Sequence, residues 1–352
     1  MVEPLRWAVA GWGAGGRVFH APMIRSAEAL ELVAVVSTNA ERAEQARAEG
    51  LSVVPGLREL RDLGVDGVTI TTPAGTHADL AVEALGLGLH VVVDKPFATS
   101  AADAERIVAA ATSGPVLTVY QNRRWDGDFL TLAGLVARGE LGRIDRFESR
   151  IERFRPDLPT WTRDRDSVHG GGTLVDLGPH LIDQAVQLLG PVREVFADIA
   201  VLGPHRVSDD DVLLLLRHEC GARSMIAASV HAAAEGPRFR VSGSLGGARL
   251  TGFDPQEDQL FSGASPQLLG DRWGEDDRTI EVDLPSGTQT RPVRRGAWNL
   301  FYPAVAAAIT EGAPVPVDPA DAVHVARIFD AARASSDRGA WVKVAPARFA
   351  SN

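Results

Sequence analysis

The sequence predicts an α/β protein with an N-terminal Rossmann-type doubly wound parallel sheet, followed by a C-terminal α+β domain with a large, mainly antiparallel sheet. Between Leu5 and Tyr120, short apolar runs alternate with helical patterns, as in repeated βα units. Beyond residue 120, the first strand candidate alternates apolar and charged residues, which is typical of an antiparallel strand with one wet face. With 352 residues, the chain is long enough for two domains or one large α/β unit.

The first part, residues 1–121, is expected to form one domain around a parallel sheet. Its apolar runs are hydrophobic at nearly every position, which suits strands covered on both faces of a parallel sheet. The predicted strands are residues 5–11, 30–37, 65–72, 90–96 and 115–120, and the helical patterns are residues 40–50, 76–88 and 100–114. Right-handed crossovers would wind these units into an open sheet.

The second part, residues 122–352, is expected to form an α+β domain, with closing helices that can pack back on the first part. Helices are predicted at residues 128–142, 173–190, 298–310 and 318–335, the last with Asp318 as cap and Pro319 in its first turn. The predicted strands are residues 143–156, 192–203, 210–218, 222–232, 237–243 and 247–250. Residues 251–295 are rich in Gly, Pro, Asp and Gln, and we expect a long loop with short strands there.

Composition favours a small-molecule partner. The formal charge of -10 gives no overall electrostatic footprint for nucleic acid or an anionic membrane. Cys220 is the only cysteine, which excludes an internal disulfide framework and a thiolate metal cluster and fits the reducing cytoplasm. The N-terminal residues lack a basic segment followed by an apolar run, so nothing marks export. We predict a cytoplasmic protein without contact to nucleic acid or membrane.

The segment "AVAGWGAGG" places Gly11, Gly13 and Gly16 in a G-x-G-x-x-G pattern between a predicted strand and a helix. In a dinucleotide site the first glycine allows the tight turn, the second lets the pyrophosphate approach and the third lets helix and strand pack closely. A glycine turn without ligand is the alternative, and the βα context favours the dinucleotide. The predicted cofactor loop comprises Gly11, Trp12, Gly13, Ala14, Gly15 and Gly16. Residues 1–121 are therefore expected to form a dinucleotide-binding domain.

The end of the second predicted strand indicates which dinucleotide binds. It carries Ser37, Thr38 and Asn39, with Arg42 just beyond, and lacks the carboxylate that would accept hydrogen bonds from the NAD ribose. Hydroxyls, an amide and a guanidinium can bind a 2′-phosphate. We therefore predict NADP, with NAD as the alternative cofactor. Arg42 could equally be a solvated helix residue.

Three residues are candidates for catalysis. Lys95 stands at the end of a predicted strand, where open α/β sheets present ligand-binding groups. Asp176 and His180 are four residues apart, hence expected on one face of a single helix. Taken singly, the lysine could be a surface charge and the pair a salt-linked helix face. Their order after a dinucleotide fingerprint favours catalysis.

These motifs resemble the glucose–fructose oxidoreductase, inositol dehydrogenase and rhizopine catabolism family, Gfo/Idh/MocA. The family's E-K-P motif corresponds to Asp94, Lys95 and Pro96, and its D-x-x-x-H pair to Asp176 and His180. The segments "GRVFHAP", "TTPAGTH", "NRRWDGDF" and "DLGPHLIDQ" are similar to the branch that contains NADP-dependent scyllo-inositol dehydrogenases. The resemblance covers nearly the whole chain.

The resemblance implies hydride transfer between a nicotinamide and a secondary hydroxyl or ketone of an inositol or pyranose. Lys95 would contact cofactor and substrate and stabilise developing negative charge, and His180 would accept the proton in oxidation. Asp176 would orient the substrate or hold the imidazole. The resemblance also implies that residues 122–352 bind the substrate and mediate oligomerisation. The expected oligomer is a homodimer or homotetramer joined through the open face of the C-terminal sheet.

Further contacts follow from the same resemblance. Cofactor contacts are expected from Thr72, Pro73, His77, Asp94, Asn122 and Arg123, and substrate contacts from Lys95, Arg123, Trp161, Asp176 and His180, with Arg163 and His169 near the sugar pocket. Trp125 is expected either to contact cofactor or substrate or to pack between the domains, and His77 could instead cap the following helix. No metal site is predicted, because no compact set of three or four ligands surrounds Asp176 and His180.

Two features depart from the family pattern. Asp94 replaces the usual Glu and is one methylene shorter, and Thr38 stands where related inositol dehydrogenases often have Arg. Two rival functions remain. One is a redox-neutral glycosidase that uses a retained nicotinamide. The other is a non-catalytic nicotinamide sensor, which the presence of both Lys95 and His180 disfavours.

Overall fold

The computed structural model describes residues 3–111, 114–155, 166, 169–204 and 206–346. Its N-terminal sheet, sheet A, contains six parallel strands in the order β3-β2-β1-β4-β5-β6. They are β1 (Leu5–Ala10), β2 (Leu30–Val36), β3 (Ser52–Val54), β4 (Gly67–Ile70), β5 (His90–Asp94) and β6 (Leu117–Tyr120). This order is that of a doubly wound dinucleotide-binding sheet, so the predicted Rossmann class is confirmed. The sequence pattern missed only the short β3.

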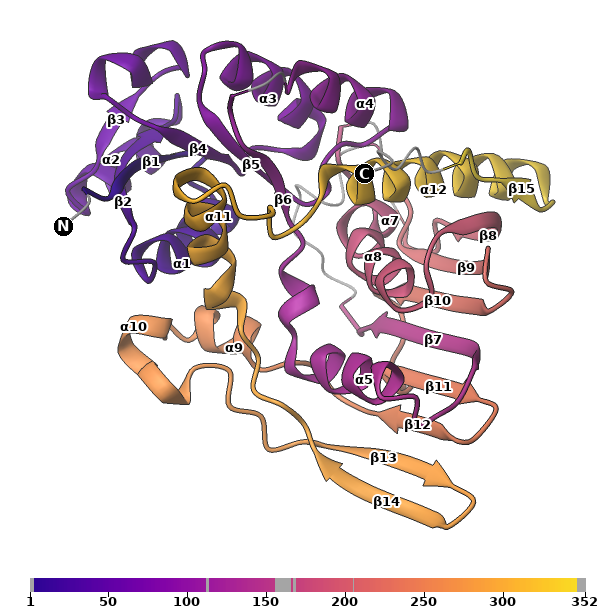
Figure 1. Cartoon of the computed structure of the whole chain (residues 1–352). Helices are drawn as coiled ribbons and strands as arrows, with labels where there is room; N and C mark the ends of the chain where they lie inside the picture. Colours follow the sequence, from indigo (N-terminus) through magenta and orange to yellow (C-terminus); the bar gives the residue numbers. More distant parts are fainter. Residues whose placement is uncertain (1–2, 112–113, 156–165, 167–168, 205, 347–352) are drawn as a thin grey trace.

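Helices cover both faces of sheet A (Figure 1). They are α1 (Ala21–Arg25), α2 (Ala40–Ala48), α3 (His77–Gly86) and α4 (Ala101–Ala110), with the short helical turns η1 (Gly15–His20), η2 (Arg58–Leu63) and η3 (Ala74–Thr76). Asn39 and Ser100 cap α2 and α4 by accepting hydrogen bonds from backbone N–H groups. β4 and β6 are fully buried and β1 and β5 largely so, as their continuous apolar runs predict, whereas β2 and the edge strand β3 are only partly buried.

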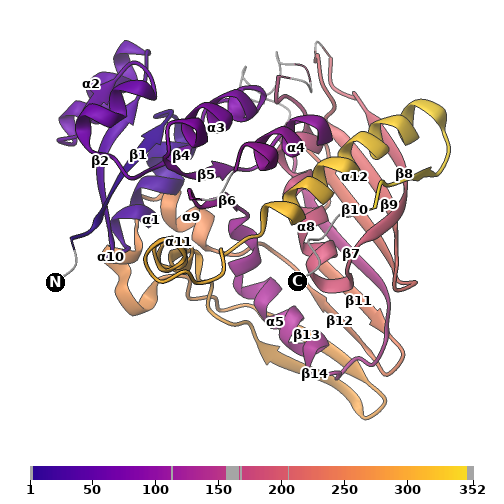
Figure 2. The same cartoon turned by 45° about the horizontal axis from the view of Figure 1, so that its top comes forward.

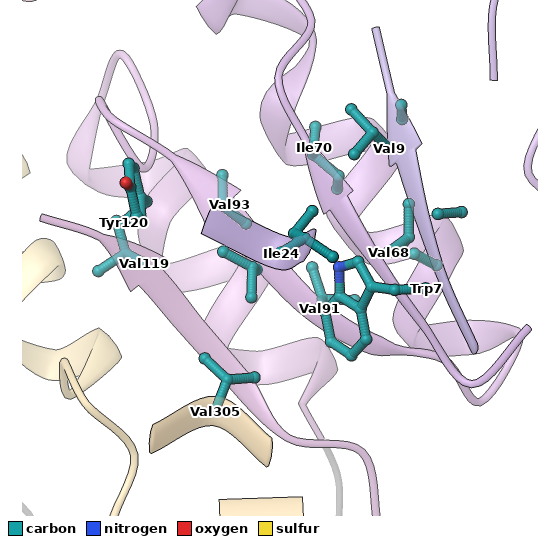
Figure 3. Packing of buried hydrophobic residues seen from close by; sticks show 14 of the residues in the cluster. Trp7, Val9, Ile24, Val68, Ile70, Val91, Val93, Val119, Tyr120 and Val305 are labelled. Carbon is teal, nitrogen blue, oxygen red and sulfur yellow. The ribbon is translucent and has the colours of Figure 1, made fainter. Parts of the chain in front are cut away.

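The C-terminal part of the chain returns to complete this core. The turn η6 (Trp298–Leu300) and α11 (Phe301–Thr310) contribute Trp298, Tyr302 and Val305 to the hydrophobic cluster of sheet A. Figure 3 shows Val305 on its helical segment among the buried side chains, which include Trp7 and Val91. The predicted closing helices therefore pack back on the first half. The last of them, α12 (Pro319–Arg338), begins after Asp318, whose carboxylate accepts a hydrogen bond from the backbone N–H of Ala320, as predicted.

The second sheet, sheet B, contains nine strands in the order β14-β13-β12-β11-β7-β10-β9-β8-β15. They are β7 (Ile144–Glu152), β8 (Val192–Ala200), β9 (Asp211–His218), β10 (Arg223–Ser229), β11 (Phe239–Gly243), β12 (Gly247–Leu250), β13 (Thr279–Leu284), β14 (Gly287–Pro292) and β15 (Val342–Lys343). All neighbours are antiparallel except β7 and β10. The mainly antiparallel sheet is confirmed.

The pairing of β7 corrects one prediction. It runs antiparallel to β11 but parallel to β10, so it is not a purely antiparallel strand. The chain leaves β7, crosses over through helices and then forms the antiparallel series β8-β9-β10, which brings β10 back in the direction of β7. A helical crossover between parallel strands is the ordinary connection of this kind.

Residues 251–295 contain more structure than a loop with short strands. They form α9 (Gln256–Phe261), α10 (Pro266–Leu269), the turn η5 (Gly270–Arg272) and the hairpin of β13 and β14. On β13 the buried residues Ile280 and Val282 alternate with more exposed ones, a period-two pattern too short to be distinctive in the sequence. Contacts of α9 with η1 and of α10 with α1 place this segment against the first half of the chain.

One face of sheet B is covered by α5 (Gly127–Ala137), α8 (Gly178–Leu189) and α12, whereas none of the helices in the described ranges covers the other face (Figure 2). On β9, Leu213 and Leu215 are exposed while their neighbours Leu214 and Leu216 are fully buried, so the two faces of the strand differ sharply. Within the described ranges, no helix is both long enough and apolar enough to span a bilayer.

The helix predicted at residues 173–190 is interrupted. It divides into α7 (Thr173–Asp176) and α8, with Leu177 between them. Pro179 has no backbone N–H to donate to the carbonyl of Val175, which accounts for the break. The prediction that Asp176 and His180 share one face of a single helix is therefore wrong, because they belong to two consecutive helices.

Candidate active site

The glycine loop joins β1 to η1 and has two kinds of glycine. Gly11 has φ of +97°, and a Cβ on Gly16 would lie 2.2 Å from the Gly11 carbonyl oxygen, so the fold itself requires these two. Gly13 is different, because the nearest protein atoms to a Cβ placed there are the guanidinium atoms of Arg42, at 3.7 Å. Protein packing does not exclude a side chain at Gly13. The open backbone there fits the close approach of a bound pyrophosphate.

The residues after β2 order the turn into α2 and bring Arg42 near the glycine loop. Asn39 accepts a hydrogen bond from the Arg42 backbone N–H (3.0 Å), and the Ser37 hydroxyl accepts one from the Asn39 N–H (3.3 Å). These contacts order the turn into α2. Thr38 and the Arg42 side chain are exposed, and the Arg42 guanidinium reaches back beside Gly13. The structure thus brings Arg42 to the glycine loop rather than leaving it on a remote helix face.

Lys95 links the two halves of the molecule. Its ammonium group donates to the carboxylate Oδ1 and to the backbone carbonyl of Asp176, both at 2.9 Å. Burial alone would lower the pKa of Lys95, but the carboxylates of Asp176 and Asp94 outweigh it and raise the pKa above its ordinary value. Lys95 is therefore a fixed cation with one N–H left to donate, because an ammonium group has three.

Asp94 lies between this lysine and the glycine loop. Its Oδ1 accepts the backbone N–H of Lys95 at 2.7 Å, and its Oδ2 would be 3.3 Å from a Cβ on Gly15. Burial tends to raise the pKa of Asp94, but His20, Lys95 and His77 together lower it below its ordinary value. Asp94 is thus an ionised carboxylate beside the predicted cofactor loop.

His180 is buried, and one of its ring nitrogens makes no hydrogen bond. Its ring Nδ1 has no hydrogen-bond partner, and it is only 5% exposed. Its pKa lies well below 6.5, first because of burial and then because of the positive charges of Lys95, Arg123, Arg238 and Arg153. The imidazole is therefore neutral at neutral pH and can accept a proton. Asp176 directs its carboxylate to Lys95, so of its two predicted roles the structure does not support holding this imidazole.

Thr72, Pro73 and His77 lie at the end of β4, close to the segment after β5. The two ring nitrogens of His77 lie 2.7 Å from the Thr72 carbonyl and 2.8 Å from the Pro96 carbonyl, and the ring is buried. The Thr72 hydroxyl contacts that of Thr76 at 2.7 Å. The His77 side chain thus joins two loops and makes no hydrogen bond that caps α3, although its backbone N–H donates to the Ala74 carbonyl at the end of η3.

Asn122, Arg123 and Trp125 lie in the turn η4 (Asn122–Trp125) that follows β6. Arg123 is buried and donates to Asp126 (3.2 Å) and to Glu257. Trp125 packs edge-on against Phe301, with ring centroids 5.8 Å apart, so its surroundings match the packing interpretation. Asn122 is also buried.

The sequence pattern missed Glu257 on α9. This carboxylate pairs with both Arg123 and Arg153, and although burial would raise its pKa, the two guanidinium groups lower it to about 2. Only the folded packing of α9 could reveal it, because residues 251–295 carry no distinctive pattern. Of the predicted pocket residues, Trp161 and Arg163 lie outside the described ranges, and His169 is exposed and bonded to Asp166 (2.7 Å).

No group of three or more His, Cys, Asp or Glu side chains is arranged to hold a metal ion within the ranges that the structure describes.

A parallel sheet of Rossmann order with an open glycine loop, next to a fixed lysine and a neutral histidine, defines a two-part nicotinamide-dependent oxidoreductase.

The comparisons with known proteins give the family. A model of the oxidoreductase family's NAD-binding Rossmann fold matches residues 5–121, and a model of its C-terminal alpha/beta domain matches residues 133–344. The chain therefore belongs to the Gfo/Idh/MocA oxidoreductase family, as the motifs predict. The prediction of an enzyme with dehydrogenase chemistry is confirmed by these matches and by the named relatives.

Two relatives and one solved structure illustrate the similarity. The chain is 37% identical to the uncharacterized oxidoreductase YdgJ of Escherichia coli, covering 94% of this chain and 96% of that protein. It is 31% identical to scyllo-inositol 2-dehydrogenase (NADP(+)) IolW of Bacillus subtilis, covering 95% and 94%. The crystal structure of an oxidoreductase from Bacillus cereus superposes with a TM-score of 0.84 at 27% identity, covering 98% and 100%.

Proposed function

We propose that this protein is an NADP-dependent dehydrogenase that transfers hydride between the nicotinamide and a secondary hydroxyl or ketone of an inositol, such as scyllo-inositol, or of a pyranose sugar. The observation that carries the proposal is the pairing of a charge-fixed lysine with a neutral, unpartnered histidine: Lys95 held by Asp176, and His180 nearby. The name of the Bacillus subtilis relative, scyllo-inositol 2-dehydrogenase (NADP(+)), supports this substrate class.

The protein's own residues divide the acid–base work. Lys95 cannot serve as the base, because the pKa of its ammonium is raised and it remains protonated. Its remaining N–H can donate to the substrate oxygen and stabilise the negative charge that develops as the hydroxyl loses its proton. His180, neutral and without a partner at Nδ1, accepts that proton in oxidation and returns it in reduction. Asp176 is a positioning group, since it holds Lys95 in place.

The loop at Gly11, Gly13 and Gly16 would hold the pyrophosphate, and Asp94 would lie beside the cofactor next to Gly15. The nicotinamide supplies the hydride acceptor or donor, which no side chain can replace. Asn122, Thr72 and Pro73 belong to the same proposed cofactor site, whereas Arg123 is committed to Asp126 and Glu257 and would act through its fixed positive charge.

The NADP preference rests on Arg42. Its guanidinium lies beside Gly13, and the turn after β2 offers Ser37, Thr38 and Asn39 in place of an acidic side chain. A guanidinium binds a phosphate by charge-assisted hydrogen bonds, and a carboxylate at this place would repel it.

We also propose a domain division near residue 121 and assembly into a homodimer or homotetramer through the uncovered face of sheet B, where Leu213 and Leu215 are exposed. Sedimentation of the purified protein, compared with that of Leu215→Asp, tests the assembly.

A cytoplasmic location is proposed from the single free cysteine, Cys220.

The test of function is direct. Purified protein is mixed with scyllo-inositol and either NADP+ or NAD+, and the absorbance of reduced nicotinamide is followed. An increase in this absorbance with NADP+ alone supports both the substrate class and the cofactor. A faster increase with NAD+ overturns the cofactor preference. If no polyol or pyranose gives an increase with either cofactor, the dehydrogenase assignment is overturned, and a redox-neutral or sensing role is indicated.

A further inference from the structure

A buried chain of three hydrogen bonds leads from the interior of sheet A to His20, which lies beside Asp94 of the active site. The indole N–H of Trp7 on β1 donates to the Thr69 hydroxyl on β4 at 2.8 Å, and that hydroxyl lies 2.8 Å from the hydroxyl of Tyr302 on α11. The Tyr302 hydroxyl lies 2.7 Å from Nδ1 of His20, at the end of η1. All four side chains are fully buried.

The hydrogen bonds end at His20, whose other ring nitrogen faces Asp94. The second ring nitrogen of His20, Nε2, lies 3.5 Å from Asp94 Oδ1, and the His20 side chain is completely inaccessible to solvent. The four hydrogen-bonded residues and Asp94 come from five elements, β1, η1, β4, β5 and α11, which folding brings together, and Tyr302 is 282 residues from His20. Burying so many polar groups is unfavourable unless each finds a partner. The polar groups of Trp7, Thr69 and Tyr302 and the Nδ1 atom of His20 partner one another, whereas His20 Nε2 makes no hydrogen bond and faces the Asp94 carboxylate as an ion-pair contact.

The chemistry of the members gives the chain a direction. The Trp7 indole can only donate, so Thr69 accepts from it and is free to donate its own proton to Tyr302. Tyr302 then donates to Nδ1 of His20, which leaves the His20 proton on Nε2, pointing at the Asp94 carboxylate. The opposite orientation would direct the Nε2 lone pair at a carboxylate, which is repulsive.

The position of the Asp94 carboxylate in turn affects Lys95. Its Oδ1 also accepts the backbone N–H of Lys95, and its negative charge is one of the two that favour the Lys95 ammonium. A carboxylate released from His20 could rotate away from that position, because the peptide N–H alone does not fix both of its oxygens.

We propose that His20 and Tyr302 are positioning residues: through the buried chain they fix the Asp94 carboxylate beside Lys95 and so maintain the charge state of the lysine. The proposal rests on the proposed role of Lys95 in catalysis. It assigns a purpose to "GRVFHAP", whose histidine neither the glycine motif nor the catalytic set explains.

The lysine content of the protein allows a test without substrate. Lys95 and Lys343 are the only lysines in the sequence, and Lys343 is exposed. Trace acetic anhydride labels only neutral amines, so the Lys95-to-Lys343 labelling ratio of the intact protein, measured by peptide mass spectrometry across pH, reports the protonation of Lys95.

Tyr302→Phe removes one hydroxyl and keeps the ring. We expect it to increase the Lys95-to-Lys343 ratio about threefold at mildly alkaline pH, since weaker hold on Asp94 lowers the pKa of Lys95. Asp94→Asn should produce a larger increase. Tyr120→Phe is the matched control: Tyr120 is buried, its ring centroid is 4.2 Å from that of His20, and its hydroxyl has no partner, so its loss should leave the ratio unchanged.

An unchanged ratio in folded Tyr302→Phe, judged by an intact thermal transition, overturns the proposal, as does an equal increase in Tyr120→Phe. Should Tyr302→Phe not fold, His20→Phe is measured in its place under the same two criteria. Because no substrate or cofactor is present, a wild-type protein inactive on polyols would count against the proposed function, and the labelling would still decide the role of His20 and Tyr302.

Discussion

The Nζ atom of Lys95 lies 2.9 Å from Oδ1 of Asp176, which joins the end of β5 in one sheet to the end of α7 beside the other. The contact spans 81 residues of sequence and brings the lysine into the neighbourhood of His180. The proposed chemistry depends on it.

Replacing the lysine should separate catalysis from binding. We expect Lys95→Ala to reduce kcat about a hundredfold or more, because it removes a donor that stabilises developing charge. Binding of NADPH, measured by fluorescence titration, should change little, since the glycine loop is untouched. Undiminished turnover in Lys95→Ala with intact cofactor binding would refute the role of the lysine.

The pH dependence should report His180. The pKa of this imidazole is lowered well below 6.5, so the neutral, proton-accepting form persists into the acidic range, and the rate of oxidation should fall only well below the pH at which an ordinary histidine is protonated. His180→Asn should reduce the rate at least about a hundredfold and abolish this acid limb. His90→Asn is the control, because the pKa of His90 is also lowered but its ring bonds the Val116 backbone, away from His180. An acid limb that persists in His180→Asn would contradict the assignment.

Cofactor preference should follow Arg42. We expect Arg42→Ala to raise the KM for NADP+ about tenfold, the loss of one charge-assisted contact, and to leave the KM for NAD+ nearly unchanged. Arg47→Ala, an exposed arginine on the same helix, provides the comparison. Equal changes for both cofactors, or none for either, would show that the guanidinium does not bind the 2′-phosphate.

Two glycines of the loop should behave differently. A Cβ on Gly16 would collide with the Gly11 carbonyl oxygen, so Gly16→Ala should lower the melting temperature. Gly13→Ala meets no atom closer than 3.7 Å and should keep the wild-type melting temperature while weakening NADPH binding. If Gly13→Ala binds NADPH as well as the wild type does, the pyrophosphate does not approach there.

The strands and helix ends that the sequence predicts correctly are those determined by a local pattern of residues. Continuous apolar runs predict β1, β2 and β5, and Asp318 before Pro319 predicts the start of α12. The Lys95, Asp176 and His180 set was also predicted, but with the wrong helix geometry, although Pro179 was visible in the sequence and could have indicated the break.

The parts that were missed depend on distant packing. Glu257 pairs with Arg123 and Arg153 only because α9 folds against them, and the parallel pairing of β7 with β10 depends on the path of the intervening helices. His20 and Tyr302 meet from opposite ends of the sequence. Spacing carries information within one helix or strand, and it carries none about partners hundreds of residues apart.

The contribution of α11 to the core of sheet A has a consequence for biosynthesis. Tyr302 and Val305 fill a core whose last strand, β6, ends at Tyr120. While the ribosome makes the intervening residues, which takes on the order of ten seconds or more, the nascent N-terminal sheet lacks part of its covering. Its apolar surface is then available to chaperones, and the native core forms only after the helix near the opposite end of the chain has emerged.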